Sequence, residues 1–297
     1  MIFRFVVSAA LSVFVAIAPQ AHAAGDSVGS SGPTKTFVYK KTKPAELQIV
    51  VHFPPGWKAS DRRAAIVFFF GGGWTNGKLS QFEPQATALA ARGLVTARAD
   101  YRVKSRHGVS PDVCVEDAKS AVRWLRQNAS MLGIDPNRVV AAGGSAGGHI
   151  AACTALTDGL EAAGEDLRIS SRPNAMILFN PVLRLDHIPA LLARVGHDEK
   201  LAKQISPNLH ISKATPPTLI FFGEQDPLMR QGEEFVRQAK QVGCRAEMVT
   251  AKDQKHGYFN HAPWAEQTLQ RADQFLVSVG YLGRPAHALQ DATALPR

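Results

Sequence analysis

Cysteine is scarce in this sequence, since only Cys114, Cys153 and Cys244 occur among the 297 residues. The three lie far apart and form no spacing that is typical of a metal site. We therefore expect neither a metal ion nor another cofactor. Because three is an odd number, at least one thiol is either unpaired or paired between molecules.

Long runs of basic residues are absent as well, although the formal net charge is +9. A basic surface favours nucleic acid, anionic polysaccharide or a negatively charged cell envelope. The Lys and Arg residues are scattered and never form a run of five. This distribution indicates a generally basic surface and not a nucleic-acid site, so we expect no nucleic-acid partner.

The N-terminal apolar run is too short to span a bilayer, which takes about 20 residues. It extends from Phe5 to Ala18, follows Arg4, and precedes Pro19 and the small-residue pattern Ala21-His22-Ala23. This order is typical of a secretory signal peptide cleaved after Ala23, the alternative being a membrane anchor. We expect residues 1–23 to be removed and the chain to be exported, periplasmic or secreted, without a stable membrane anchor.

The remaining chain has the composition of a globular protein, with 45% hydrophobic and 20% charged residues overall. Residues 24–35 are rich in Gly and Ser, which predicts a flexible linker, and residues 284–297 form a similarly loose tail. No internal repeat or change in composition marks a second domain between them. We predict a single domain over residues 36–283.

Within that domain, short apolar runs alternate with amphipathic ones. Most of the apolar runs are continuous, which is typical of buried parallel strands. The alternation predicts an α/β fold, a mostly parallel sheet with helices on both faces. The expected strands are 47–53, 64–70, 95–99, 139–142, 175–179, 218–222 and 248–251, and the expected helices are 81–92, 111–127, 230–241 and 264–279.

The segment Gly143-Gly144-Ser145-Ala146-Gly147 lies between an apolar strand and a small-residue helix. A G-x-S-x-G pattern in this context is typical of a nucleophile elbow, where only small flanking residues leave room for the sharp turn. The following helix N-terminus favours negative charge that develops near Ser145. Alternatives are a packing turn or an anion-binding loop. We predict Ser145 as a nucleophile and the N–H group of Ala146 as an oxyanion donor.

A second glycine-rich loop, Gly71-Gly72-Gly73-Trp74, directly follows the expected strand 64–70. Glycines let backbone N–H groups approach a substrate oxygen, although in a simple turn they would merely permit positive φ. Two such loops after buried strands favour catalysis. We predict that the N–H groups of Gly72 and Gly73 complete an oxyanion hole.

A nucleophilic serine needs a histidine to take its proton and a carboxylate to orient that histidine. In this architecture the chain order is serine, acid, histidine. After the strand 218–222, Asp226 is the predicted acid, with Glu224 as a weaker candidate and helix capping as an alternative role for Asp226. His256 is the predicted base, because it lies in a short polar loop between a strand and the last helix. The later histidines, His261 and His287, lie near a helix start and in the loose tail.

These motifs resemble the α/β-hydrolase carboxylesterases, especially hormone-sensitive-lipase-like enzymes and bacterial acetyl-xylan and feruloyl esterases. The resemblance covers roughly residues 47–282 and includes Asp100-Tyr101-Arg102 and Asp135-Pro136-Asn137-Arg138. It implies the α/β-hydrolase fold, with a small lid insertion at about residues 181–212.

Two features depart from that family pattern. A histidine usually precedes the oxyanion glycines, whereas this chain has Phe70, which cannot make the hydrogen bonds that hold the loop. Lipase-like members also carry cap helices ahead of the loop, whereas residues 24–70 offer mostly linker and strand. We expect a less tightly held oxyanion loop and a more open site.

The sequence thus predicts a serine carboxylesterase that cleaves short-chain or aromatic esters through an acyl-enzyme. Acetyl or feruloyl esters on plant polysaccharide are the expected substrates, so the partner is a small-molecule or polysaccharide ester. Alternatives are a serine exopeptidase-like hydrolase and a catalytically silent hydrolase fold that acts as a binding module. The sequence does not indicate an oligomeric state.

Overall fold

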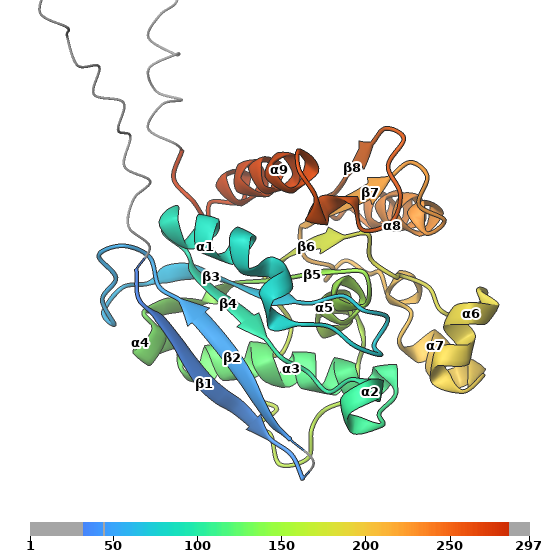
Figure 1. Cartoon of the computed structure of the whole chain (residues 1–297), viewed down its shortest axis with the longest axis horizontal. Coiled ribbons are helices and arrows are strands. Elements are labelled where there is room, and N and C mark those ends of the chain that lie inside the picture. Colours follow the sequence, from blue (N-terminus) through green and yellow to red (C-terminus); the bar gives the residue numbers. More distant parts are fainter. Residues whose placement is uncertain (1–31, 44, 285–297) are drawn as a thin grey trace, which may run out of the picture.

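The computed structural model describes residues 32–43 and 45–284. The predicted signal peptide, most of the predicted linker and nearly all of the tail lie outside these ranges. The described chain forms an eight-stranded sheet with the order β1-β2-β4-β3-β5-β6-β7-β8 (Figure 1). The strands are β1 (Thr34–Lys41), β2 (Glu46–His52), β3 (Arg63–Phe69), β4 (Val95–Ala99), β5 (Ile134–Gly144), β6 (Ala175–Phe179), β7 (Thr218–Gly223) and β8 (Ala246–Ala251).

The strands from β3 to β8 run parallel, and β2 joins this parallel part antiparallel to β4. This is the mostly parallel sheet that the sequence predicts. The longer helices are α1 (Glu83–Ala91), α3 (Pro111–Gln127), α5 (Ala146–Leu156), α8 (Met229–Gln241) and α9 (Trp264–Ser278). Short helices are η1 (Leu79–Phe82), α2 (Lys104–His107), α4 (Ala129–Leu132), α6 (Pro189–Leu192), η2 (Ala193–Val195), α7 (Glu199–Gln204), η3 (Pro207–Leu209) and η4 (Tyr258–Asn260).

Two apolar cores lie on opposite faces of the sheet. Helices α3, α5 and α8 cover one face, and α1 and α9 cover the other (Figure 1). Their apolar side chains belong to the two cores. Helix α3 illustrates the sequence rule, because its apolar residues recur on one buried face and Pro111 occupies a first-turn position where no N–H donor is needed. The bounds of α3, β4 and β6 are those that the sequence predicts.

The edge strand β1 is not among the predicted strands. It begins at Thr34, so the predicted linker of residues 24–35 is wrong for its last two residues. The strand carries mostly exposed polar side chains, with Tyr39 as its one buried residue. Such a strand has a weak hydrophobic pattern, because few of its side chains are buried. It is ordered chiefly by its antiparallel pairing with β2.

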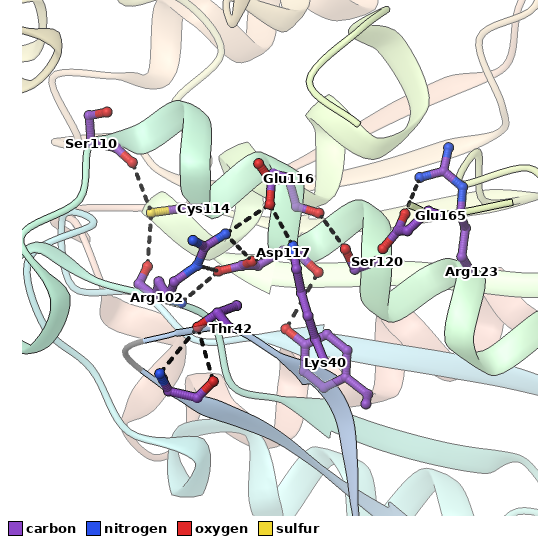
Figure 2. Close-up of polar contacts among 12 residues, drawn as sticks. Lys40, Thr42, Arg102, Ser110, Cys114, Glu116, Asp117, Ser120, Arg123 and Glu165 are labelled. Carbon is purple, nitrogen blue, oxygen red and sulfur yellow. Dashed lines mark hydrogen bonds and ion pairs between the residues drawn. The ribbon is translucent and has the colours of Figure 1, made fainter. Parts of the chain in front are cut away.

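A partly buried ionic network, with Asp117 at its centre, joins β1 to α3 (Figure 2). The Asp117 carboxylate accepts hydrogen bonds from Lys40 Nζ at 2.8 Å and from Arg102 Nη2 at 2.7 Å. Glu116 also pairs with both cations. These carboxylates raise the pKa of Arg102 above its usual value. Arg102 of the Asp100-Tyr101-Arg102 motif thus fixes the chain where β4 leaves the sheet.

The predicted lid region, residues 181–212, contains α6, η2, α7 and η3. These short helices lie together beside the carboxyl ends of the central strands (Figure 1). Asp198 caps α7 by accepting a hydrogen bond from the N–H of Leu201 at 2.9 Å. Ahead of Phe70, the described residues form only strands and loops.

All three cysteines are free thiols, and Cys114 and Cys153 are buried. Burial raises the pKa of Cys153 to about 12, so its thiol stays protonated and packs as a small apolar group. Within residues 32–43 and 45–284, no helix is both long and apolar enough to cross a bilayer.

Candidate active site

Ser145 lies at the sharp turn between β5 and α5. Its backbone angles are φ 54° and ψ −116°, a region that non-glycine residues seldom occupy. The Ser145 N–H group donates to Phe179 O at 2.8 Å, which ties the turn to the end of β6. A strained backbone conformation held by neighbouring strands is the nucleophile-elbow geometry that the sequence predicts.

Two glycines make this turn possible. A Cβ atom on Gly147 would lie 2.1 Å from Phe69 O, and one on Gly143 would lie 2.4 Å from Gly147 O. Both distances are far below van der Waals contact, and the obstructing atoms belong to the backbone. Any side chain at either position would therefore force the strands and the elbow apart.

The three residues predicted as nucleophile, base and acid lie together. His256 Nε2 is 2.9 Å from Ser145 Oγ, and His256 Nδ1 is 2.7 Å from Asp226 Oδ2. Asp226 is buried, whereas 38% of the His256 side chain is exposed to solvent. A hydroxyl, an imidazole and a carboxylate in this order can transfer a proton from the hydroxyl to the imidazole.

The alternative acid and base candidates lie elsewhere. Glu224 is exposed on the same loop as Asp226, and His261 is exposed beyond η4. His287 lies outside the described residues. Asp226 also has the local role considered from the sequence, because its Oδ1 accepts a hydrogen bond from the N–H of Leu228 at 2.9 Å. One carboxylate oxygen therefore orders the loop and the other faces His256.

The glycine loop after β3 lies against the elbow. A Cβ atom on Gly71 would be 3.4 Å from Ser145 Cβ, which places the two loops in contact. Gly72 and Gly73 have φ angles of 129° and 60°, and a Cβ on Gly72 would lie 2.2 Å from Asn76 O. Among the described residues, no acceptor pairs with the N–H groups of Gly72, Gly73 or Ala146. Three donors without a protein partner beside a hydroxyl are suited to binding an oxyanion.

This loop is held by other contacts although position 70 is not a histidine. The Phe70 ring stacks on Tyr101 at a centroid distance of 4.2 Å, and the Tyr101 hydroxyl donates to Phe70 O at 2.7 Å. Trp74 Nε1 donates to Nδ1 of His149, whose Nε2 is 2.7 Å from Ile205 O beside α7. Burial lowers the pKa of His149 to about 4, so the neutral ring links the loop, α5 and the lid.

Two amide side chains connect the oxyanion loop to the loop of His256. Gln81 Oε1 accepts from the N–H of Gly71 at 2.6 Å, and Gln81 Nε2 donates to Asn260 Oδ1 at 3.0 Å. Asn260 Nδ2 in turn donates to Gly257 O, next to His256, at 2.9 Å. Sequence inspection missed these residues, because polar residues 179 positions apart give no local signal of contact.

We expect a Gln81→Leu variant to lose roughly tenfold in kcat/KM for an ester, the equivalent of about one hydrogen bond. The variant removes the side-chain amide, which leaves the Gly71 N–H unpaired and the loop less well held. The measurement is steady-state hydrolysis together with the thermal unfolding midpoint. Gln238→Leu is the matched control, because Gln238 makes its side-chain hydrogen bond to Glu234 on α8. Equal activity of the two variants would show that this connection does not position the loop.

A third missed residue is Asn180, whose Nδ2 donates to Asp226 Oδ2 at 2.6 Å. The one signal in the sequence is its place directly after an apolar strand, where polar side chains face the same sheet edge as Ser145. Within the described ranges, no group of three His, Cys, Asp or Glu side chains is arranged to hold a metal ion.

Two family models match the chain. One, described as BD-FAE, matches residues 51–180, and one described as alpha/beta hydrolase fold matches residues 190–260. Among curated proteins, carboxylesterase NlhH of Mycobacterium tuberculosis is 29% identical over 237 residues, which cover 73% of this chain and 72% of the relative.

Solved structures give a closer match. Esterase 2 of Thermogutta terrifontis phosphoramylated by tabun is 46% identical, with a TM-score of 0.81, and the match covers 85% of this chain and 97% of that one. The propionate-bound structure of the same esterase is 45% identical, with a TM-score of 0.80 and the same coverage. Both glycine loops, residues 71–74 and 143–147, fall within the segment that the BD-FAE model matches.

Proposed function

Since this chain belongs to the α/β-hydrolase carboxylesterase family, we propose that Ser145, His256 and Asp226 are the catalytic triad of its ester hydrolysis. The enzyme is a serine carboxylic ester hydrolase. The observation that supports the residue assignment is the continuous contact from the Ser145 hydroxyl through His256 to the buried Asp226 carboxylate.

In the proposed mechanism, His256 Nε2 accepts the proton of Ser145 Oγ as this oxygen attacks the ester carbonyl. The N–H groups of Gly72, Gly73 and Ala146 stabilise the oxyanion of the tetrahedral intermediate. The imidazolium then gives its proton to the departing alcohol oxygen, which leaves an acyl group on Ser145. A water molecule deprotonated by His256 then attacks the acyl carbon, and the imidazolium returns that proton to Ser145 Oγ as the bond between Oγ and the acyl carbon breaks, which releases the acid and restores the hydroxyl. Asp226 orients His256 and stabilises its positive charge throughout.

The proposed substrates are acetyl or feruloyl esters on plant polysaccharide. Three observations support this class. More than a third of the His256 side chain is exposed, which suits a bulky alcohol portion that remains partly in solvent. The related esterase of Thermogutta terrifontis binds propionate, a short acyl product. The N-terminal signal-like pattern supports export to the place where polysaccharide is met, and export is part of the proposal.

The test is an ester panel with the mature chain. We expect hydrolysis of p-nitrophenyl acetate, release of acetate from acetylated xylan, and release of ferulate from feruloylated arabinoxylan, with p-nitrophenyl decanoate as a poor substrate. Ser145→Ala, assayed in parallel, controls for contaminating esterases. Cleavage of small aryl esters without release of acetate or ferulate from either polysaccharide would refute the polysaccharide assignment and leave the esterase assignment intact.

A further inference from the structure

Asn180 occupies the position directly after β6, at the edge of the sheet where the site lies. Asn180 is fully buried, and its φ angle of 45° is uncommon for a residue other than glycine. Its N–H group donates to Phe221 O of β7 at 2.8 Å, which holds the backbone between the two strands. The backbone that carries the Asn180 side chain is thus held in place, and the side chain is enclosed by its neighbours.

The Asn180 amide contacts the carboxylate of the triad. Nδ2 of Asn180 lies 2.6 Å from Asp226 Oδ2, the same oxygen that lies 2.7 Å from His256 Nδ1. The opposite orientation of the amide would put two acceptor oxygens at this distance, so its NH₂ group must face Asp226. With the N–H of Leu228 on Oδ1, the buried carboxylate receives three hydrogen bonds. Donors on both oxygens restrict its rotation.

Two features of Asn180 oppose stability. Its Oδ1 is buried and has no hydrogen-bond partner within the described part of the chain, and its backbone is in the left-handed region. A buried unpaired acceptor and a positive φ both cost free energy. Asparagine tolerates a positive φ better than most residues, but that conformation does not account for a buried amide with an unpaired oxygen, whereas the hydrogen bond to Asp226 gives its NH₂ group a partner.

The end of β6 also reaches the nucleophile. Phe179 O accepts the hydrogen bond of the Ser145 N–H group at 2.8 Å, and the next residue contacts Asp226. Two successive residues of one strand end therefore locate the nucleophile's backbone and the acid's side chain. Their separation is set by a single peptide unit, which is rigid.

From this geometry we infer that Asn180 is a positioning residue, which holds the Asp226 carboxylate so that Oδ2 faces His256 Nδ1. The inference rests on the proposed triad. Asn180 does not touch the ester, so its effect must pass through Asp226. This dependence distinguishes it from a residue that only stabilises the fold.

A double-mutant cycle tests this dependence. Asn180→Leu keeps four side-chain heavy atoms branched at Cγ and removes the donor, and we expect kcat for p-nitrophenyl acetate to fall about 10- to 100-fold, the range typical of outer-shell partners at other sites. KM should stay within about twofold. Asp226→Asn should lower kcat by a factor on the order of 10⁴. In that background, Asn180→Leu should change kcat less than about threefold, because its target is already lost.

Asn208→Leu is the matched control. Asn208 is buried and has an unpaired Oδ1 like Asn180, but its Nδ2 bonds to Glu234 and to Gln231 O, away from the triad. We expect its kcat to equal that of the wild type, with a comparable loss in the thermal unfolding midpoint. If Asn180→Leu does not fold, Asn180→Gly removes the same donor while accommodating the positive φ.

The outcomes separate the two claims. Wild-type activity in Asp226→Asn would overturn the proposed triad. Loss of activity in Asp226→Asn with an unchanged kcat in Asn180→Leu or Asn180→Gly would overturn only the role of Asn180. Multiplicative effects in the double variant would also overturn it, because they would show that Asn180 acts independently of Asp226.

Discussion

Hydrolysis of p-nitrophenyl acetate by a Ser145→Ala variant is expected to fall by a factor on the order of 10⁶ in kcat, as for other triad nucleophiles. The acyl-enzyme cannot form without Oγ, and the oxyanion donors alone give little turnover. His256→Ala should lose a similar factor, since its Nε2 is the base that contacts Ser145 Oγ within the described part of the chain. Combining the two changes should add almost nothing, because the residues act as a unit.

The measurement is kcat, with labelling by a fluorophosphonate probe as a second observation. The wild type should be labelled, and neither Ser145→Ala nor His256→Ala should be labelled at a comparable rate. His261→Ala is the control for the histidine, because His261 is exposed and makes only backbone hydrogen bonds. Labelling of the Ser145→Ala chain would place the reactive group elsewhere, and a native chain that resists the probe would support the silent binding module.

Replacement of Gly147 by alanine is expected to damage both the fold and the activity. The new Cβ would lie 2.1 Å from Phe69 O and 2.3 Å from Phe70 O, and neither backbone atom can rotate away. We expect a destabilisation of about 3 kcal/mol, which corresponds to a fall in the unfolding midpoint on the order of 6–10 °C. Because Phe70 leads directly into the oxyanion loop, kcat should fall more than about 100-fold.

Gly148→Ala is the graded comparison within the same helix. Its Cβ would lie 3.0 Å from Gly143 O and 3.1 Å from the Pro181 side chain, contacts that a small shift relieves. We expect a smaller change in the unfolding midpoint and in kcat than for Gly147→Ala. Thermal unfolding followed by circular dichroism, with kcat on the same preparations, decides the order. Equal behaviour of the two variants would contradict a steric requirement specific to position 147.

Several features of this protein were accessible from local patterns. The bounds of α3, β4 and β6 follow from the hydrophobic pattern, because α3 buries one face and the two strands are buried along their whole length. The elbow is equally local, since Gly143 and Gly147 flank Ser145 within five residues. Asp226 and His256 are predicted because this architecture has the chain order serine, acid, histidine, and because each follows a predicted strand of a parallel sheet, whose strand ends meet at one edge.

Edge strand β1 shows where periodicity fails. Its residues alternate weakly and expose polar side chains, so the free energy that orders them comes from pairing with β2 and from the ion pairs of Lys40. Strand β2 is predicted as residues 47–53, but neither its pairing with β1 nor the ion pairs of Lys40 are apparent in the local sequence. The hydrogen bonds that hold the oxyanion loop are equally hidden in the sequence. Tyr101 and Gln81 take the place of the hydrogen bonds that a histidine at position 70 would make, but they reach the loop only because β4 and η1 pack beside β3.

By itself, then, the sequence determined the order of the parallel strands and the long helices, the glycines of the two loops and the residues proposed as nucleophile, acid and base. These depend on backbone sterics and on residue types within a few positions of one another. Tertiary structure alone decided which distant amides support them: Asn180 beside Asp226, and Gln81 joined to Asn260. A hydrogen bond between side chains acts over about 3 Å, and only the packing of the sheet brings these residues within that range.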